Sequence, residues 1–183
     1  EKLEWIMADL RHMMQIKVDK LGFGGCNFPI LLYVLSCMEW IGFLLRDGDL
    51  SNNQLQNTKA NINASIDLLP NEYHSDLVRE FVIKLFRNGT VHQFGPKSSG
   101  VSRGNIFHPP IAFIGLTPVI DADQLATDFS MALDNLVEEI ISNQIDFAKI
   151  SERLSFVFIK DNNELASILV LAGLAQDLRK TRD

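Results

Sequence analysis

Hydrophobic residues recur at helical spacing along most of the chain. The longest stripe includes Leu125, Phe129, Leu133, Leu136 and Ile140, which fall three or four residues apart and therefore lie on one face of a helix. The same spacing recurs elsewhere, interrupted by glycine, proline and polar clusters. On this pattern we predict core helices over residues 2–20, 29–46, 60–69, 71–92, 121–147 and 162–180.

The pattern changes between residues 93 and 120. Gly95-Pro96 and His108-Pro109-Pro110 are turn signals, and 111–120 is rich in β-branched and aromatic residues. A small β-hairpin or extended insertion is expected here. The predicted fold class is mainly α, an antiparallel helical bundle carrying this insertion, with residues 1–183 as a single domain.

The segment from Ile30 to Leu45 is the most apolar of the chain. It has about 16 residues, whereas a membrane-spanning helix needs about 20, so it predicts a buried central helix and no membrane partner. Gly42 would allow another helix to approach closely. Glu39 interrupts the segment, and an unpaired carboxylate in a core is costly. It either faces the surface beside Ser36 or pairs with a buried cation such as Arg87.

Charge is distributed unevenly. The chain carries a net charge of −6, which by itself disfavours a nucleic-acid partner. Residues 79–108, however, hold five basic side chains against Glu80 alone, a net charge of +4, while the remainder carries −10. A basic patch on an acidic body is compatible with binding a polyanion. The charged first residues indicate no signal peptide, and the two cysteines fit reduced thiols, so a cytoplasmic location is predicted.

The basic window contains the motif Arg87-Asn88-Gly89-Thr90-Val91-His92. Arginine is a permanent planar cation suited to phosphate, and histidine exchanges a proton near neutral pH. A second Arg-x4-His pattern, Arg103 to His108, lies in a glycine- and proline-rich loop where side chains are expected to be poorly fixed. The first copy follows an apolar-periodic helix and has a polar residue directly after the arginine, so context favours Arg87 and His92.

Helical geometry constrains this motif. Arginine and histidine five residues apart diverge by about 140° on an ideal α-helix. The two side chains converge only if Gly89 distorts the helix, or if a second copy of the protein completes the site. His92 shares a face with Phe81 and Leu85, so a packed histidine with no catalytic role is an alternative.

A helical bundle whose later helix ends in Arg-polar-x3-His resembles the HEPN domain superfamily, over roughly residues 1–95. The resemblance implies a metal-independent endoribonuclease, toxin-like or defence-related, acting as a homodimer and leaving a 2′,3′-cyclic phosphate. Arg87 would grip the scissile phosphate, His92 would act as general acid or base, and Asn88 would orient the imidazole or a phosphate oxygen. Lys84, Lys97 and Glu39 are expected to support the site. The partners implied are RNA and a neutralising protein, with no metal and no cofactor.

Two other interpretations remain open at this point. The chain could be a non-catalytic helical dimerisation module, or a nucleotide- or ligand-binding module, with the motif serving the subunit interface. Alternatively the motif is structural, with Arg87 paired to Glu39 or Glu80 and His92 packed in the core.

Overall fold

The computed structural model describes residues 2–16, 26–89, 98–104 and 111–180. The chain forms two compact units, Glu1–Ile145 and Asp146–Asp183. The first unit contains the helical core and a small sheet. The second contains the helix α8 (Phe147–Lys180).

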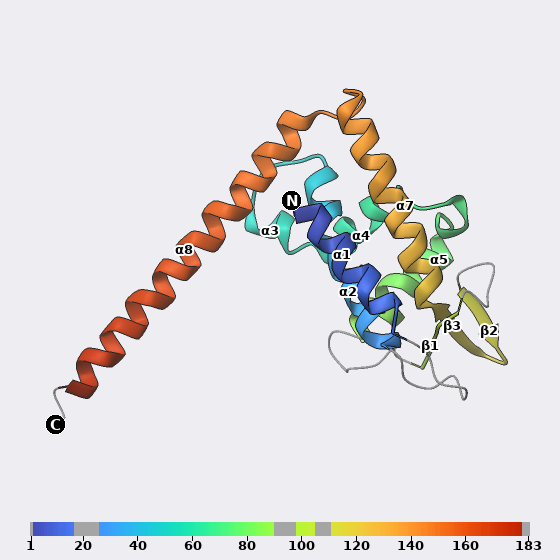
Figure 1. The fold of residues 1–183 in the computed structure, drawn as a ribbon, viewed down its shortest axis with the longest axis horizontal. Coiled ribbons are helices and arrows are strands. Elements are labelled where there is room, and N and C mark those ends of the chain that lie inside the picture. The colour runs from blue at the N-terminus through green and yellow to red at the C-terminus, as the bar shows by residue number, and fades with distance from the viewer. Residues whose placement is uncertain (1, 17–25, 90–97, 105–110, 181–183) are drawn as a thin grey trace. The chain divides into compact units, whose positions relative to one another are not determined.

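The first unit is built around helix α2 (Asn27–Leu45). Helices α1 (Lys2–Met14), α4 (Thr58–Ile66) and α7 (Ala122–Ile141) pack against it (Figure 1). A helix that is apolar all round must be covered on every side, and Leu31, Val34 and Leu35 of α2 are fully buried. Among the described residues α2 is the one helix long and apolar enough to cross a membrane. Ten of its residues are buried, most of them in the core of the first unit, as predicted for a central helix.

Gly42 is the point of closest approach between α2 and α4. A Cβ atom at this position would lie 1.7 Å from the carbonyl oxygen of Asn61. The Asn61 side chain is itself buried, where it donates to the carbonyls of Gln54 and Leu55 and accepts from Arg46 Nη1. The expected role of Gly42 is confirmed, because only glycine leaves room for the neighbouring backbone.

The predicted helix over residues 71–92 is wrong in its start and in its regularity. Residues 71–73 form the 3₁₀ turn η1 (Asn71–Tyr73), and α5 (Asp76–Glu80) begins after it. The cap of α5 is Ser75, whose hydroxyl accepts from the Val78 N–H. A π-helix, η2 (Phe81–Arg87), then follows directly. The short helix α3 (Asn52–Leu55) lies outside the predicted helices.

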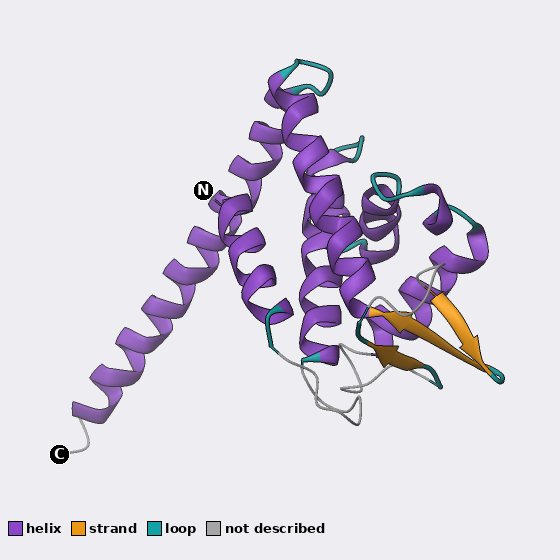
Figure 2. Cartoon of the chain, turned by 45° about the vertical axis from the view of Figure 1, so that its right-hand side comes forward, coloured by secondary structure: helices purple, strands orange, loops and turns teal. Residues whose placement is uncertain are grey.

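The insertion is a three-stranded mixed sheet, β1 (Gly100–Ser102), β2 (Ile111–Ile114) and β3 (Thr117–Asp121), in the order β1-β3-β2. Strand β3 pairs parallel with β1 and antiparallel with β2. Strands β1 and β2 therefore form the two edges of this sheet (Figure 2). Pro118 is tolerated in the central strand because its missing N–H points away from β2, on the side where pairing with β1 starts only at Val119.

Helix α7 is anchored at its first turn and along its buried face. Asp121 caps it by accepting from the N–H groups of Asp123 and Gln124. The Gln124 side chain does not complete a capping box but donates to Asp128. The other oxygen of Asp128 accepts from the hydroxyl of Tyr73, 2.8 Å away and fully buried. This bond fixes η1 to α7, and desolvation raises the pKa of Tyr73.

The fold class predicted from the sequence is confirmed, since the protein is mainly helical with a small β insertion. The boundaries of α2 lie within two residues of the prediction. Helix α8 also includes residues 150–159, which lie between two of the predicted helices.

Candidate functional site

Arg87 lies at the end of the π-helix η2 and forms an ion pair with Glu39 of α2. Its Nε and Nη2 atoms both donate to Glu39 Oε2, at 3.2 and 2.7 Å. The side chains are 17% and 21% exposed, so the pair is largely but not fully withdrawn from water. Of the two placements considered for Glu39, the structure has the pairing with Arg87.

Glu39 is held by a second contact. Its Oε1 atom accepts a hydrogen bond from the Thr58 hydroxyl, at the first residue of α4. Each carboxylate oxygen therefore has its own donor, which fixes the orientation of the carboxylate and of the guanidinium paired with it. No sequence signal identifies Thr58 as part of this cluster, because it is brought there by the packing of α4 on α2.

The guanidinium of Arg87 has one edge without a partner among the described residues. Nη1 forms no hydrogen bond with any residue that the structure describes, while Nε and Nη2 are directed at Glu39. A guanidinium offers five N–H donors in a fixed fork. The ion pair therefore orients Arg87 and leaves donors for an anionic oxygen on the opposite edge.

The helix departs from α geometry before Gly89 rather than at it. The Asn88 N–H donates to the carbonyl of Ile83, five residues earlier, which is the π-helical hydrogen bond. Such widened turns are rare and are frequent at functional sites. These turns precede Arg87, and Asn88 and Gly89 are α-helical, so η2 does not alter the angle between Arg87 and His92. The expected convergence of the two side chains stays a prediction, because residues 90–92 lie outside the described residues.

The other predicted site residues are less tightly engaged. Asn88 is half-buried, and its side chain forms no hydrogen bond with a described residue. Lys84 is 68% exposed and pairs with Glu80, which also accepts from Lys59 at 2.7 Å. Glu80 therefore serves the two lysines and not Arg87. His92 and Lys97 lie outside the described residues.

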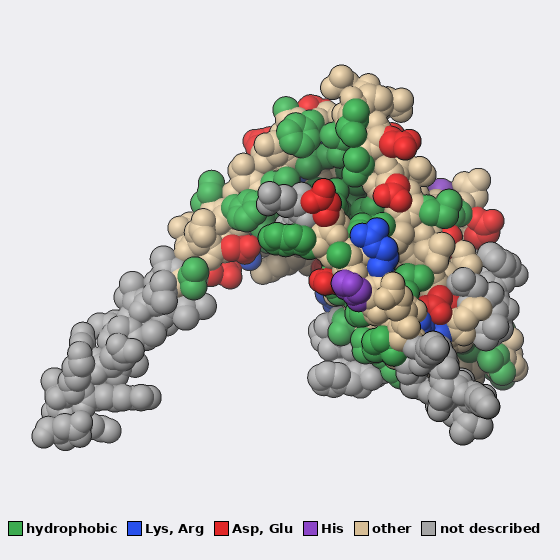
Figure 3. Space-filling view, viewed as in Figure 1, with side chains coloured by type: hydrophobic (Ala, Val, Ile, Leu, Met, Phe, Trp, Pro, Cys, Tyr) green, Lys and Arg blue, Asp and Glu red, His purple; other side chains and the backbone are tan. Residues whose placement is uncertain are grey.

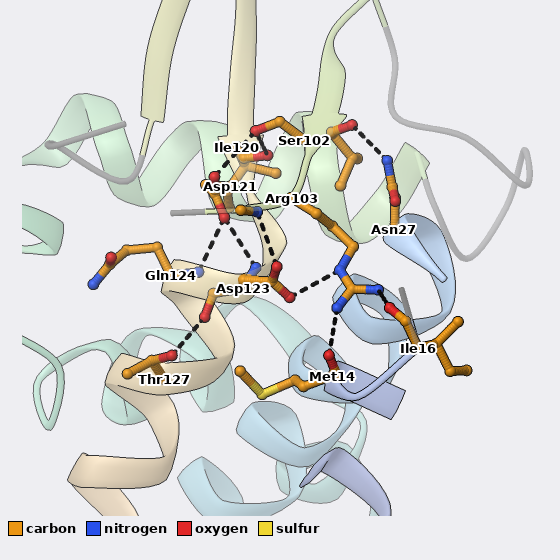
Figure 4. Close-up of polar contacts among 12 residues, drawn as sticks. Met14, Ile16, Asn27, Ser102, Arg103, Ile120, Asp121, Asp123, Gln124 and Thr127 are labelled. Carbon is orange, nitrogen blue, oxygen red and sulfur yellow. Dashed lines mark hydrogen bonds and ion pairs between the residues drawn. The ribbon is translucent and has the colours of Figure 1, made fainter. Parts of the chain in front are cut away.

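Arg103, the arginine of the second motif copy, has a different environment (Figure 4). Its Nε donates to Asp123 at 2.9 Å, and its Nη1 and Nη2 donate to the carbonyls of Ile16 and Met14 at 2.9 and 2.8 Å. Its side chain is 3% exposed. The expectation of a poorly fixed side chain is wrong, because Arg103 joins the carbonyls at the end of α1 to the first turn of α7.

Among the described residues, no three histidine, cysteine, aspartate or glutamate side chains gather as metal ligands. Comparison of the chain with known protein families, curated proteins and solved structures found no match.

Proposed function

We propose that the protein is a HEPN-like, metal-independent endoribonuclease whose site is centred on Arg87. The observation that carries this proposal is the guanidinium of Arg87, which Glu39 and Thr58 orient from one side while Nη1 is left without a described partner. A preoriented, partly desolvated guanidinium suits a phosphate undergoing attack, because it stabilises the charge that develops on the phosphate oxygens.

The roles follow from the chemistry of each group. Arg87 would bind a non-bridging oxygen of the scissile phosphate, and Glu39 would act as a positioning residue for it. His92 would take the proton of the ribose 2′-hydroxyl or give one to the leaving 5′-oxygen, a contribution typically of about 10²–10⁴-fold. Asn88 would orient the histidine or a phosphate oxygen, with Lys84 and Lys97 attracting the polyanion. Attack by the 2′-hydroxyl yields a 2′,3′-cyclic phosphate and a free 5′-hydroxyl.

The wider context is part of the same proposal and rests on the family resemblance. The enzyme would act as a homodimer in the cytoplasm, in a toxin-like or defence-related role, with a neutralising protein as partner. The basic window around the motif supports RNA binding, since it carries a net charge of +4 on an acidic chain.

The test is cleavage of single-stranded RNA in the presence of EDTA. The wild-type protein should cleave and leave 2′,3′-cyclic phosphate ends, and an RNA with 2′-deoxy sugars should resist. Arg87→Ala and His92→Ala should each lower the rate by at least about 100-fold. Arg11→Ala, at an exposed arginine of α1, is the matched control and should cleave normally. Cleavage that survives both motif substitutions would overturn the proposal.

One observation favours a second candidate function. The carboxylate of Glu39 already neutralises Arg87, as a structural ion pair would. In this alternative the protein is a non-catalytic dimerisation or ligand-binding module, and the motif stabilises the subunit interface. It predicts no RNA cleavage, together with a dimer that Arg87→Ala weakens in light scattering. Cleavage that depends on Arg87 and His92 would exclude it.

A further inference from the structure

Strand β2 lies at one edge of the small sheet. Strand β2 pairs on one side with β3, and no described strand pairs with its other side (Figure 2). Its backbone forms no hydrogen bond with a described residue beyond that ladder. Unpaired edges of this kind template pairing with another strand unless charge, proline or a bulge blocks them.

The register identifies which backbone groups are free. Ile114 pairs with Thr117 across the two-residue loop Gly115-Leu116, with a positive φ at Gly115. The pair flanking such a loop is hydrogen-bonded, and hydrogen-bonded pairs alternate with non-hydrogen-bonded ones. Ala112 and Ile114 therefore direct their N–H and C=O groups at β3. Ile111 and Phe113 direct theirs outward.

The side chains at this edge are apolar and exposed. Phe113 is 56% exposed, Ile114 62% and Leu116 97%. Figure 3 shows hydrophobic side chains reaching the surface at the end of the molecule where Figure 1 places β2. Residues 109–120 contain no charged side chain, so none of the charges that usually block an edge strand is present.

We propose that this edge pairs with the same edge of a second copy of the chain, joining the two sheets about a two-fold axis at Ala112. The edge is uncharged, so two copies do not repel each other. Its outward groups, at Ile111 and Phe113, are two residues apart. Two identical antiparallel strands satisfy these groups only in registers that place outward groups opposite one another. Ile111 opposite Phe113 satisfies both residues of each strand, with four backbone hydrogen bonds.

This register makes a geometric prediction. Ala112 faces its own copy in a non-hydrogen-bonded pair, with Cα atoms about 4.5 Å apart, a separation that a disulfide spans. The two Ile114 residues are offset by four positions in this register, about 13 Å along the strands. The inference rests on the sheet and not on the proposed RNA chemistry.

The experiment is oxidative cross-linking of the full chain at low micromolar concentration. Ala112→Cys should form a disulfide-linked dimer, whereas Ile114→Cys, at a more exposed position, should cross-link at least about tenfold less. The wild-type chain with Cys26 and Cys37 serves as the blank. Equal cross-linking of the two variants indicates random collision and overturns the proposal, as does the absence of a cross-link in Ala112→Cys.

A second pair of variants guards against misfolding at position 112. Phe113→Pro removes only an outward N–H, because Phe113 lies opposite Pro118 at a non-hydrogen-bonded position. Phe113→Ala loses the same ring contact with Phe81 but keeps that N–H. In sedimentation, Phe113→Pro should dimerise at least about tenfold more weakly than Phe113→Ala. Equal dimerisation, or a wild type that stays monomeric, overturns the proposal. If the protein cleaves RNA but does not form this dimer, the proposed interface is wrong and the proposed active site is unaffected.

Discussion

Arg87 and Arg103 each begin an Arg-x4-His segment, yet they occupy different kinds of place. Arg103 is 3% exposed, and each of its three nitrogen atoms donates to Asp123 or to a backbone carbonyl at the end of α1. Arg87 is 17% exposed, and one carboxylate oxygen accepts from two of its nitrogens. Every guanidinium nitrogen of Arg103 thus donates to the protein, whereas the guanidinium of Arg87 is held by Glu39 at one edge only among the described residues.

This difference separates a structural arginine from a candidate ligand-binding one. The buried guanidinium of Arg103, in which every nitrogen donates to the protein, is not available to a phosphate. A guanidinium that is held at one edge and partly exposed is preoriented for an anion at the other edge. The number of remaining donors, and not the sequence pattern, distinguishes the two sites.

The largest loss of stability should come from substituting Arg103. Arg103→Met leaves Asp123 Oδ1 and two carbonyls without their donor, while Asp123 Oδ2 still accepts from the Gly104 N–H. Breaking a buried ion pair costs about 3–5 kcal/mol. Urea unfolding should show this loss in the free energy of unfolding. Arg11→Met, at an exposed arginine, is the control. A loss below about 1 kcal/mol would contradict the structural role.

The next largest loss of stability should come from substituting Gly42, where α4 approaches α2 and places Thr58 beside Glu39. Gly42→Ala places a methyl group against the backbone of Asn61 and should cost about 3 kcal/mol. Gly115→Ala is the control, since it has open space around it and only the strain of its positive φ, about 1–2 kcal/mol. Thermal unfolding of both variants measures the difference. Equal losses would mean that the approach of α4 to α2 is not close.

The ion pair of Arg87 and Glu39 should give a smaller but measurable coupling free energy. A double-mutant cycle with Arg87→Ala and Glu39→Ala should yield about 1–2 kcal/mol, less than for a fully buried pair because both side chains are partly exposed. The more exposed pair Lys59 and Glu80, 61% and 34% exposed, provides a reference of about 0.5 kcal/mol or less. Absence of coupling would show that Arg87 and Glu39 do not interact in solution.

The smallest effect concerns Glu80, the residue directly before the π-helix η2. Hydrogen bonds from Lys59 and then Lys84 lower its pKa from 4.5 to about 2. Because the pKa is lowered in the folded state, its contribution to stability is present above pH 4.5 and lost as the pH falls towards 2. An NMR titration should find a midpoint near 2 that rises in Lys59→Ala. A midpoint near 4.5 in the wild type would show that the two lysines do not hold this carboxylate.

The features that local pattern controls could be predicted from the sequence. The apolar run of α2 predicts a central helix, and Gly42 predicts a close helix contact, both as found. Each depends on neighbouring residues or on the all-round hydrophobicity of a single element.

The features that depend on tertiary contacts could not. The partners of Arg103 at Ile16 and Met14 lie 87 and 89 residues away in sequence. Thr58 reaches Glu39 only because α4 packs on α2. The π-helix also has no sequence signal here, since Phe81–Arg87 reads as an ordinary amphipathic helix. The sequence predicted the pairing of Arg87 with Glu39 only as one of two alternatives.

The most direct test of the account is RNA cleavage in EDTA by Arg87→Lys, compared with wild type at equal folded fraction. Lysine keeps the charge that pairs with Glu39 but loses the planar fork that engages carboxylate and phosphate together. If Arg87 binds the scissile phosphate, cleavage should fall by at least about 100-fold while the free energy of unfolding changes by less than about 1 kcal/mol. Cleavage within a few-fold of wild type would contradict the assignment of Arg87 to the active site.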